Sequence, residues 1–266
     1  MQAVSKIPTE FKKSIKPQEY AMEPPKTDVV GAADFESDEY LANVVWASLS
    51  EAPQECVERF KGGARYRREF APFGAAREYS AESVAQIAAM LPPGQSLILF
   101  TAMKPEIPSG YAVTLDANGH QMIAEKKFRQ SSDARVVRLG PDDVSDMLQL
   151  VEITRPGPFN SRTNELGNFF GIREKGRLVA MAGERMAAGR HVEVSAVCTH
   201  PDWRGKGLGR LLVEHVSASI QQHDRIPFLH VFTTNTPAIR LYRELGFRIA
   251  RTLHVTAIVH SPAGES

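Results

Sequence analysis

A glycine-rich turn between a strand pattern and a helix pattern constrains the fold of this chain more than any other feature. Residues 191–199 alternate in the manner of a half-buried strand. Glycine then occupies three alternate positions, Gly205, Gly207 and Gly209, and apolar side chains follow at helical spacing over residues 206–223. A strand, a tight turn and a helix in direct succession are therefore predicted.

A turn of this kind can hold a phosphate group. Glycine leaves consecutive backbone N–H groups open to a ligand, and the start of a helix adds a partial positive charge. Arg204, Lys206 and Arg210 add formal positive charge around the turn. The chain has no G-x-x-x-x-G-K-[ST] run, and Arg210 stands where a dinucleotide loop needs its third glycine. An ordinary basic surface turn is the alternative that the glycine spacing alone leaves open.

Two longer sequence matches support the interpretation of this turn as a phosphate-binding site. The run THPDWRGKGLG resembles the R/Q-x-x-G-x-G/A pyrophosphate loop of the GNAT superfamily of acetyl-CoA-dependent N-acetyltransferases, through Arg204, Gly207 and Gly209. That family's second signature, N-x-x-A-x-x-x-Y-x-x-x-G-F, matches NTPAIRLYRELGF at residues 235–247. The resemblance covers about residues 135–260 and is greatest to the FR47-like branch, which is related to the glycine N-acyltransferases.

The resemblance implies an α/β fold whose mixed, mostly antiparallel sheet opens between two strands to admit acetyl-CoA. The loop amides would hold the pyrophosphate, and the free backbone of the preceding strand would pair with the pantetheine amides, as an added strand pairs with a sheet edge. No metal is expected. The implied cofactor-binding residues are Val197, Cys198, Thr199, Arg204, Gly205, Lys206, Gly207, Leu208, Gly209, Arg210, Asn235, Ala238 and Tyr242.

Transfer of an acetyl group to an amine needs a proton acceptor and a proton donor. Glu193 is the candidate base, because many family members carry a glutamate at this place, and we expect a partly desolvated cleft to raise its pKa. Tyr242 is the candidate acid that protonates the departing thiolate. A solvent-facing glutamate and a core tyrosine are the alternatives. Cys198 has only His200 as a nearby basic partner, so we expect it to be buried packing rather than a nucleophile.

The loop over residues 154–167 lies where the family covers its acceptor site. Arg155 and Arg162 in this loop could hold a substrate carboxylate. The predicted acceptor is therefore the primary amine of a small molecule, amino-acid-like if these arginines bind it. The alternative is a non-catalytic GNAT-fold protein that binds acyl-CoA or a partner.

The first half of the chain carries no second glycine loop. Residues 1–38 are predicted to be an extended arm, residues 39–130 a smaller α/β domain, and residues 133–266 the catalytic domain. The FR47-like branch often carries a degenerate N-terminal copy of the same fold. That implies a monomer with pseudo-dimeric halves, or a homodimer.

Local patterns predict the order of elements in the second half. They indicate a strand (135–139), a helix (141–153), an irregular loop (154–167), strands near 168–173, 177–187 and 190–199, a helix (206–223), a strand (227–234), a helix (237–245) and a strand-like end.

Local patterns also divide the first half into elements. A helix over 39–51 and a shorter helix after Pro53 are followed by a clear helix that Ser80 caps. Residues 96–102 form a buried strand. A hairpin is predicted over residues 111–125 with its turn at Asn118-Gly119, and a polar linker follows at 125–134.

Composition excludes several classes of protein. The formal net charge is only +1, so a nucleic-acid partner is not expected. Two cysteines far apart argue against a disulfide framework or a zinc site, and they suit a reducing cytoplasm. No apolar run reaches the roughly 18 residues of a membrane span. The expected location is therefore the cytoplasm, with no membrane partner.

Overall fold

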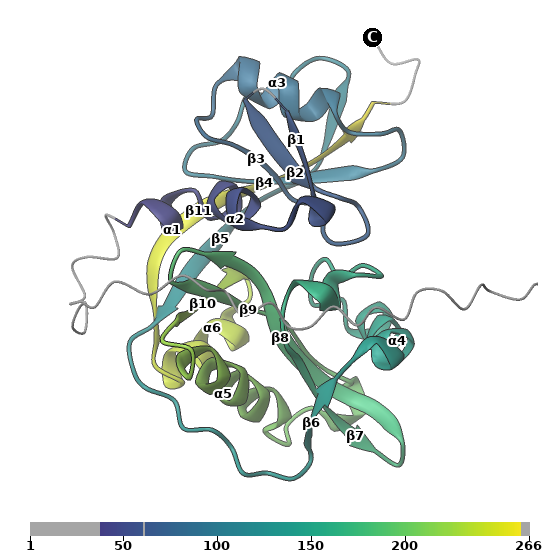
Figure 1. Ribbon diagram of the computed structural model, residues 1–266, viewed down its shortest axis with the longest axis vertical. Coiled ribbons are helices and arrows are strands. Elements are labelled where there is room, and N and C mark those ends of the chain that lie inside the picture. The colour runs from purple at the N-terminus through teal and green to yellow at the C-terminus, as the bar shows by residue number, and fades with distance from the viewer. Residues whose placement is uncertain (1–37, 61, 262–266) are drawn as a thin grey trace, which may run out of the picture. The chain divides into compact units, whose positions relative to one another are not determined.

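A mixed sheet of eight strands forms the centre of the computed structural model, which describes residues 38–60 and 62–261 (Figure 1). The strand order is β4-β11-β5-β10-β9-β8-β7-β6. Only β9 and β10 pair in parallel, and the other neighbours run antiparallel. The prediction of a mixed, mostly antiparallel sheet is confirmed. The predicted arm lies outside the described residues, apart from Asp38 at its end.

The second half of the chain alternates strands and helices as its sequence predicts. Its elements are β6 (Val136–Leu139), α4 (Val144–Thr154), β7 (Phe169–Glu174), β8 (Arg177–Ala188), β9 (His191–Thr199), α5 (Leu208–Gln221), β10 (Ile226–Phe232), α6 (Thr236–Glu244) and β11 (Phe247–His260). Short 3-10 turns lie at 141–143, 163–166 and 201–203.

Helices cover this half of the sheet on both faces. Val194 of β9 packs with Leu212 and Val216 of α5, in a core cluster that also includes α6. Cys198, further along β9, packs with Met147 of α4 in a second cluster. The apolar spacing of α5 thus directs its buried stripe onto one face of β9, and α4 occupies the other face.

The first half of the chain folds as a small sheet with helices around it. Its elements are α1 (Glu39–Ala42), α2 (Val44–Glu51), β1 (Val57–Phe60), β2 (Gly63–Tyr66), β3 (Gly74–Ala76), α3 (Ala81–Ala89) and β4 (Ser96–Thr101). Strands β1, β2 and β3 form this separate sheet in that order. The predicted cap is confirmed, because the Ser80 hydroxyl accepts from the backbone N–H of Ser83 at 3.1 Å.

Two helix predictions in the first half need correction. The helix predicted over residues 39–51 is divided at Asn43, whose side-chain amide donates to the carbonyl of Ala76 at 2.7 Å. The helix predicted after Pro53 is wrong, because only a 3-10 turn at Gln54–Cys56 precedes strand β1. Residues 57–60 pair with β2 as a strand, and this pairing outweighs the helical spacing of the apolar side chains in that segment.

The hairpin predicted at Asn118-Gly119 is also wrong. Residues 111–124 form one long strand, β5 (Tyr111–Ala124), which pairs with β11 over its length and with β10 over its second half. A Cβ on Gly119 would lie 3.1 Å from a methyl group of Val255, so this glycine permits close strand packing rather than a turn.

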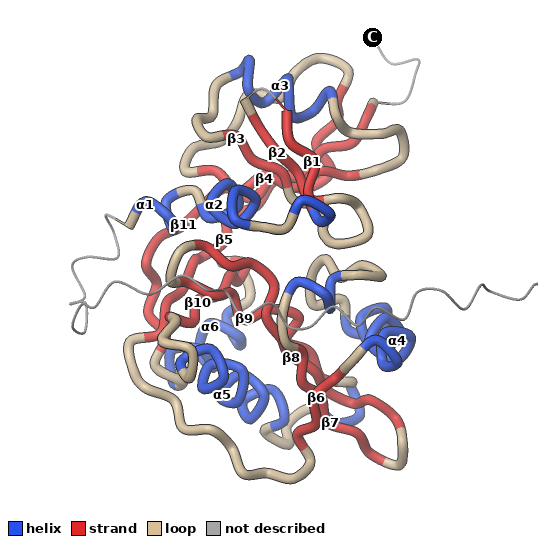
Figure 2. Tube along the Cα trace, viewed as in Figure 1, coloured by secondary structure: helices blue, strands red, loops and turns tan. Residues whose placement is uncertain are grey.

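Strands β5 and β11 join the two halves of the chain. Beyond His254, β11 pairs with β4 of the first half as well as with β5. The predicted linker at 125–134 is a loop without helix or strand, but β5 before it already lies in the middle of the main sheet (Figure 2). The division into two domains, and the first one as a degenerate copy, remain predictions.

A truncated chain tests whether residues 133–266 can fold alone. This fragment lacks β4 and β5, so β11 loses both of its neighbours and β10 loses one, and unpaired backbone is exposed. We expect aggregation and no cooperative denaturant unfolding, whereas residues 38–266 should give one cooperative transition. A soluble fragment with its own sharp transition would instead support the predicted domain division.

Candidate functional site

The site begins where two parallel strands of the sheet separate. β9 and β10 pair only over Ile226↔His191, Pro227↔Val192 and Phe228↔Glu193. β9 continues to Thr199 and β10 to Phe232 without pairing to each other. The backbone of β9 beyond Glu193 and the backbone of β10 beyond Phe228 therefore do not pair with each other. The sheet opens between these two segments.

A bulge in β9 marks the same point. The register between β8 and β9 shifts between Met181↔Cys198 and Gly183↔Ser195, and Ala196 within the bulge has a φ of 52°. A non-glycine residue with positive φ is uncommon and is found where surrounding structure imposes it. The predicted backbone ligands Val197, Cys198 and Thr199 follow this bulge.

The glycine-rich turn lies exposed at the start of α5, as predicted. Arg204, Gly205, Lys206 and Gly207 are exposed, and Gly207 is the N-cap of the helix without any side-chain capping bond. Gly205 and Gly207 have φ values of 76° and 75°, which favour glycine. The first N–H groups of α5 therefore point outward from a turn that leaves space for an anion.

Gly209 fits a diphosphate for a different reason. It lies inside the first turn of α5 without positive φ, and a Cβ there would meet only the Thr199 hydroxyl, at 3.7 Å. No packing within the protein requires glycine at this position, although glycine weakens a helix. A ligand that approaches the backbone closely would explain it.

Side chains of the turn are held by local contacts. The Arg204 side chain donates to the Thr199 carbonyl at 3.4 Å, and the Lys206 ammonium lies 3.9 Å from the centre of the Trp203 ring. Arg210 is paired with Glu244 of α6. Leu208 is buried in the core beneath the turn, so only its backbone is offered to a ligand.

The second signature lies at the start of α6 and along it. The Asn235 side chain accepts from the Ala238 N–H at 3.3 Å, so Asn235 is the N-cap of this helix. Tyr242 is buried in the core cluster beside Phe247, and burial raises its pKa to about 12. A phenol with this pKa is protonated at neutral pH, which is the form that a proton donor needs.

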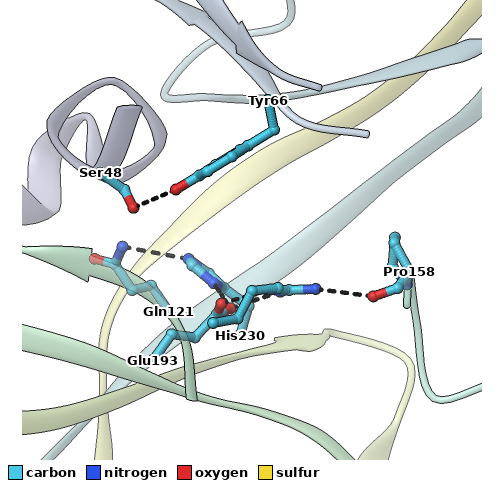
Figure 3. A network of polar contacts seen from close by, with 7 residues as sticks. Ser48, Tyr66, Gln121, Pro158, Glu193 and His230 are labelled. Atoms are coloured by element: carbon cyan, nitrogen blue, oxygen red, sulfur yellow. Dashed lines mark hydrogen bonds and ion pairs between the residues drawn. The ribbon is translucent and has the colours of Figure 1, made fainter. Parts of the chain in front are cut away.

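Glu193 lies at the last position of β9 that pairs with β10, inside a buried polar network (Figure 3). Its side chain is 1% exposed and accepts two hydrogen bonds of 2.8 Å from Arg185 of β8. Nδ1 of His230, on β10, lies 2.8 Å from the same carboxylate. His230 is also 3.4 Å from the side-chain nitrogen of Gln121, which donates to the carbonyl of Leu41 in α1.

The expected rise in the pKa of Glu193 is wrong. Burial acts to raise it, but the charge of Arg185 and the hydrogen bonds from His230 and Arg185 together lower it to about 2. Glu193 is therefore a carboxylate at neutral pH, held by two donors. Because a carboxylate only accepts hydrogen bonds, the Nδ1 atom of His230 carries the hydrogen in this contact, and Nε2 of the same ring is the atom that lies 3.4 Å from the side-chain nitrogen of Gln121.

Arg185 and His230 are functional candidates that the sequence analysis missed. The Arg185 guanidinium lies 4.6 Å from the ring of Phe73, in the first half of the chain, and donates to the Pro158 carbonyl at 3.4 Å. Arg185 is eight residues before Glu193 on the neighbouring strand, and His230 comes from the parallel strand on the other side. A buried arginine and a histidine on strands that flank the candidate base are the signal that could have found them.

Cys198 and two histidines near it in the sequence make structural contacts. The thiol of Cys198 faces α4, and burial raises its pKa to about 11, so it is a poor nucleophile, as expected. His200 receives hydrogen bonds from the Arg177 side chain at 2.9 Å and the Asp202 N–H at 3.3 Å. His191 is buried beside Asp38.

The two arginines predicted to hold a substrate carboxylate do not converge on this network. Arg162 makes two bonds of 2.7 Å with Glu165 and lies over the Phe70 ring. Arg155 is exposed and ends α4 in a left-handed conformation, with a φ of 47°. Nothing brings their guanidinium groups together on one ligand.

The model of the family described as FR47-like protein matches residues 169–255, which contain the strand opening, the glycine-rich turn and the second signature. A solved structure of a putative GNAT-family acetyltransferase from Novosphingobium aromaticivorans is 36% identical, with a TM-score of 0.79, and the match covers 85% of this chain and 100% of that one.

Two curated relatives match shorter stretches. The [ribosomal protein bS18]-alanine N-acetyltransferase of Salmonella typhimurium is 29% identical over 138 residues, or 47% of this chain and 90% of the relative. The UPF0157 protein YqkA of Bacillus subtilis is 29% identical over 85 residues, and the chain spans only 24% of its length. The chain belongs to the GNAT family of acetyltransferases.

Within residues 38–60 and 62–261, no group of three or more histidine, cysteine, aspartate or glutamate side chains is placed to hold a metal ion. No helix within the described ranges is long and apolar enough to cross a membrane.

The low pKa of Glu193 predicts how acid acts on stability. A pKa of about 2 in the folded protein, below the ordinary 4.5, means that ionised Glu193 stabilises the fold above pH 4.5. That contribution, about 3 kcal/mol from the displacement, is lost as the pH falls from 4.5 toward 2. We expect Glu193→Gln to lower the free energy of unfolding by roughly 3–5 kcal/mol at neutral pH, because it leaves Arg185 buried without its counter-charge.

Urea unfolding at a series of pH values checks this, and the deficit of the variant should shrink as the pH falls. Glu165→Gln, which removes a surface partner of Arg162, is the matched control and should cost less than about 1 kcal/mol at any pH. A deficit of the Glu193 variant that stays constant across the acid range would contradict the assignment.

Proposed function

We propose that the protein transfers the acetyl group of acetyl-CoA to the primary amine of a small molecule by direct attack. The opening between β9 and β10 beside the exposed turn of residues 204–207 carries this proposal. The turn supplies N–H donors and positive charge for a diphosphate, and the unpaired strand edges supply partners for the amides of the pantetheine arm. The two buried free cysteines suit the reducing cytoplasm that we propose as its location.

Proton transfer is assigned to Glu193 and His230 as a pair. Acetyl-CoA would supply the thioester carbonyl that the amine attacks. Nε2 of His230 takes the proton that the amine loses, after the side-chain amide of Gln121, 3.4 Å away, turns from it, while Glu193 holds the ring through Nδ1 and stabilises the imidazolium that results. Arg185 keeps Glu193 ionised and in place. The predicted base thus acts through the histidine beside it.

Tyr242 is proposed as the proton donor to the departing sulfur. Burial keeps its phenol protonated, and its helix begins at Asn235, at the end of the opening formed by β10. When the carbon–sulfur bond breaks, the phenol proton passes to the thiolate. Proximity of amine and thioester contributes the larger part of the rate.

A non-catalytic protein that binds acyl-CoA is the second candidate. The observation that favours it is the state of Glu193, which two donors hold as a carboxylate with a pKa of about 2. A carboxylate with this pKa is a weak base by itself. The two candidates differ in whether His230 supports turnover, which can be measured directly.

Replacement of Gly209 by alanine tests the cofactor site. The new methyl group meets only the Thr199 hydroxyl at 3.7 Å, and alanine favours a helix by up to about 1 kcal/mol, so stability should be unchanged or higher. Acetyl-CoA affinity should fall at least about tenfold, because the methyl group keeps the diphosphate from the helix amides. Titration calorimetry gives the dissociation constant.

Gly140→Ala is the matched control, because it is a glycine without positive φ and with open space around its Cβ. It should bind acetyl-CoA as the original chain does. Equal affinity in all three proteins would overturn the assignment of the turn as the diphosphate site.

Replacement of His230 by glutamine tests catalysis. Glutamine can still donate to Glu193 but cannot accept a proton. We therefore expect kcat in a thiol-release assay to fall about 10²-fold or more, with acetyl-CoA affinity retained. His120→Gln, which alters a histidine bonded to Thr252 on β11, is the control and should keep its kcat. An unchanged kcat in the His230 variant would remove it from the mechanism, and no thiol release by the unaltered protein with any amine would favour the binding protein.

A further inference from the structure

A cavity of about 310 Å³ is lined by residues from both halves of the sequence. Residues 65–72 and 94–98 of the first half form most of its wall, and Pro158 and Asn160 of the loop over residues 154–167 close it. No residue of the glycine-rich turn lines it. The volume is at the lower end for small-molecule sites.

Hydrogen bonds fix the two walls of this cavity to each other. The Asn160 amide donates to the Arg68 carbonyl at 2.5 Å, and the Thr163 hydroxyl donates to the Phe70 carbonyl at 2.5 Å. Between these two bonds, the backbone N–H of Arg162 donates to the backbone carbonyl of Glu69 at 2.8 Å. Arg162, predicted as a substrate ligand, therefore helps to hold the wall. The cavity is formed before any ligand arrives.

The charged residues that line the cavity are both arginines. Arg65 is buried and bonded to Glu58, which also pairs with Arg67. Arg68 is exposed and has no ion pair within the described residues. No lining residue is acidic. A guanidinium group with free donors at the rim of a small cavity suits an anion.

Wall residues of the cavity also contact the network around Glu193. Pro158, a lining residue, accepts from Arg185 through its carbonyl. Tyr66, on the opposite wall, bonds to Ser48 at 2.7 Å and lies near enough for the charges of Glu193 and Arg185 to act on its hydroxyl (Figure 3). The cavity therefore borders the network on the side of Arg185 and Glu193.

We infer that this cavity is the acceptor subsite, and that it binds an amine that also carries an anionic group, a carboxylate or a phosphate, through Arg68. The inference rests on the proposed function, because it takes the network around Glu193 as the place where the amine reacts. It assigns a task to the first half of the chain, which contributes most of the wall and both arginines. The acceptor is small and polar at both ends.

The experiment compares matched ligands that differ only in the anionic group. Common amino acids are paired with their amides, and phosphoethanolamine with ethanolamine. Each is titrated calorimetrically into the full chain with and without saturating coenzyme A, and coenzyme A binding is measured first. We expect at least one anionic member to bind about tenfold or more tightly than its neutral partner. The pair that shows the preference distinguishes carboxylate from phosphate.

Arg68→Gln should abolish that preference while leaving coenzyme A affinity unchanged, because its side chain is exposed and its carbonyl still accepts from Asn160. Arg77→Gln, an exposed arginine elsewhere in the first half, should retain the preference. Equal binding of anionic and neutral partners by the unaltered chain, or a preference that survives Arg68→Gln, would overturn the inference even if coenzyme A binds. If coenzyme A does not bind but the anion preference is present, the proposed function is wrong and the anion site is still supported.

Discussion

The separation of β9 and β10 after three paired residues is the constraint on which the site depends. Backbone N–H and C=O groups in the middle of a sheet normally find partners in the next strand. Here both strands continue without pairing to each other, and the bulge at Ala196, with its positive φ, shifts the register at the same place. The sheet therefore offers a ladder of amide partners to an extended molecule, with the N-terminus of α5 at one end of that ladder.

The buried contact of Glu193 with Arg185 is better explained by function than by stability. Taking two charges out of water costs several kcal/mol each, and apolar residues of similar size often stabilise a core as well or better. Glu193 is 1% exposed and Arg185 8%, so little of that cost is relieved by solvent. What the pair gains is a fixed carboxylate that sets the tautomer of His230 at the point where the strands part. The other ring nitrogen, Nε2, lies 3.4 Å from the side-chain nitrogen of Gln121.

The sequence predicted those features that depend on neighbouring residues. The Ser80 cap, the glycine turn and the order of elements after residue 135 follow from local chemistry, and all are found. The hairpin at Asn118-Gly119 was wrong because pairing with β10 and β11 outweighs a turn signal two residues long. The pKa of Glu193 was wrong for a similar reason, since Arg185 and His230 reach it only through the register of three strands.

The first half of the chain belongs to the site through strand pairing as well as side-chain contacts. β5 lies between β10 and β11, so the strand that carries His230 is paired on one side by residues of the first half and separates from β9 on the other. Gln121 of β5 bridges His230 and the Leu41 carbonyl of α1. A displacement of the first half would therefore move the histidine and the arginine-lined wall together. In the proposed reaction, the amine and His230 would be positioned by the same part of the structure, whereas the turn that would hold the diphosphate belongs to the second half alone.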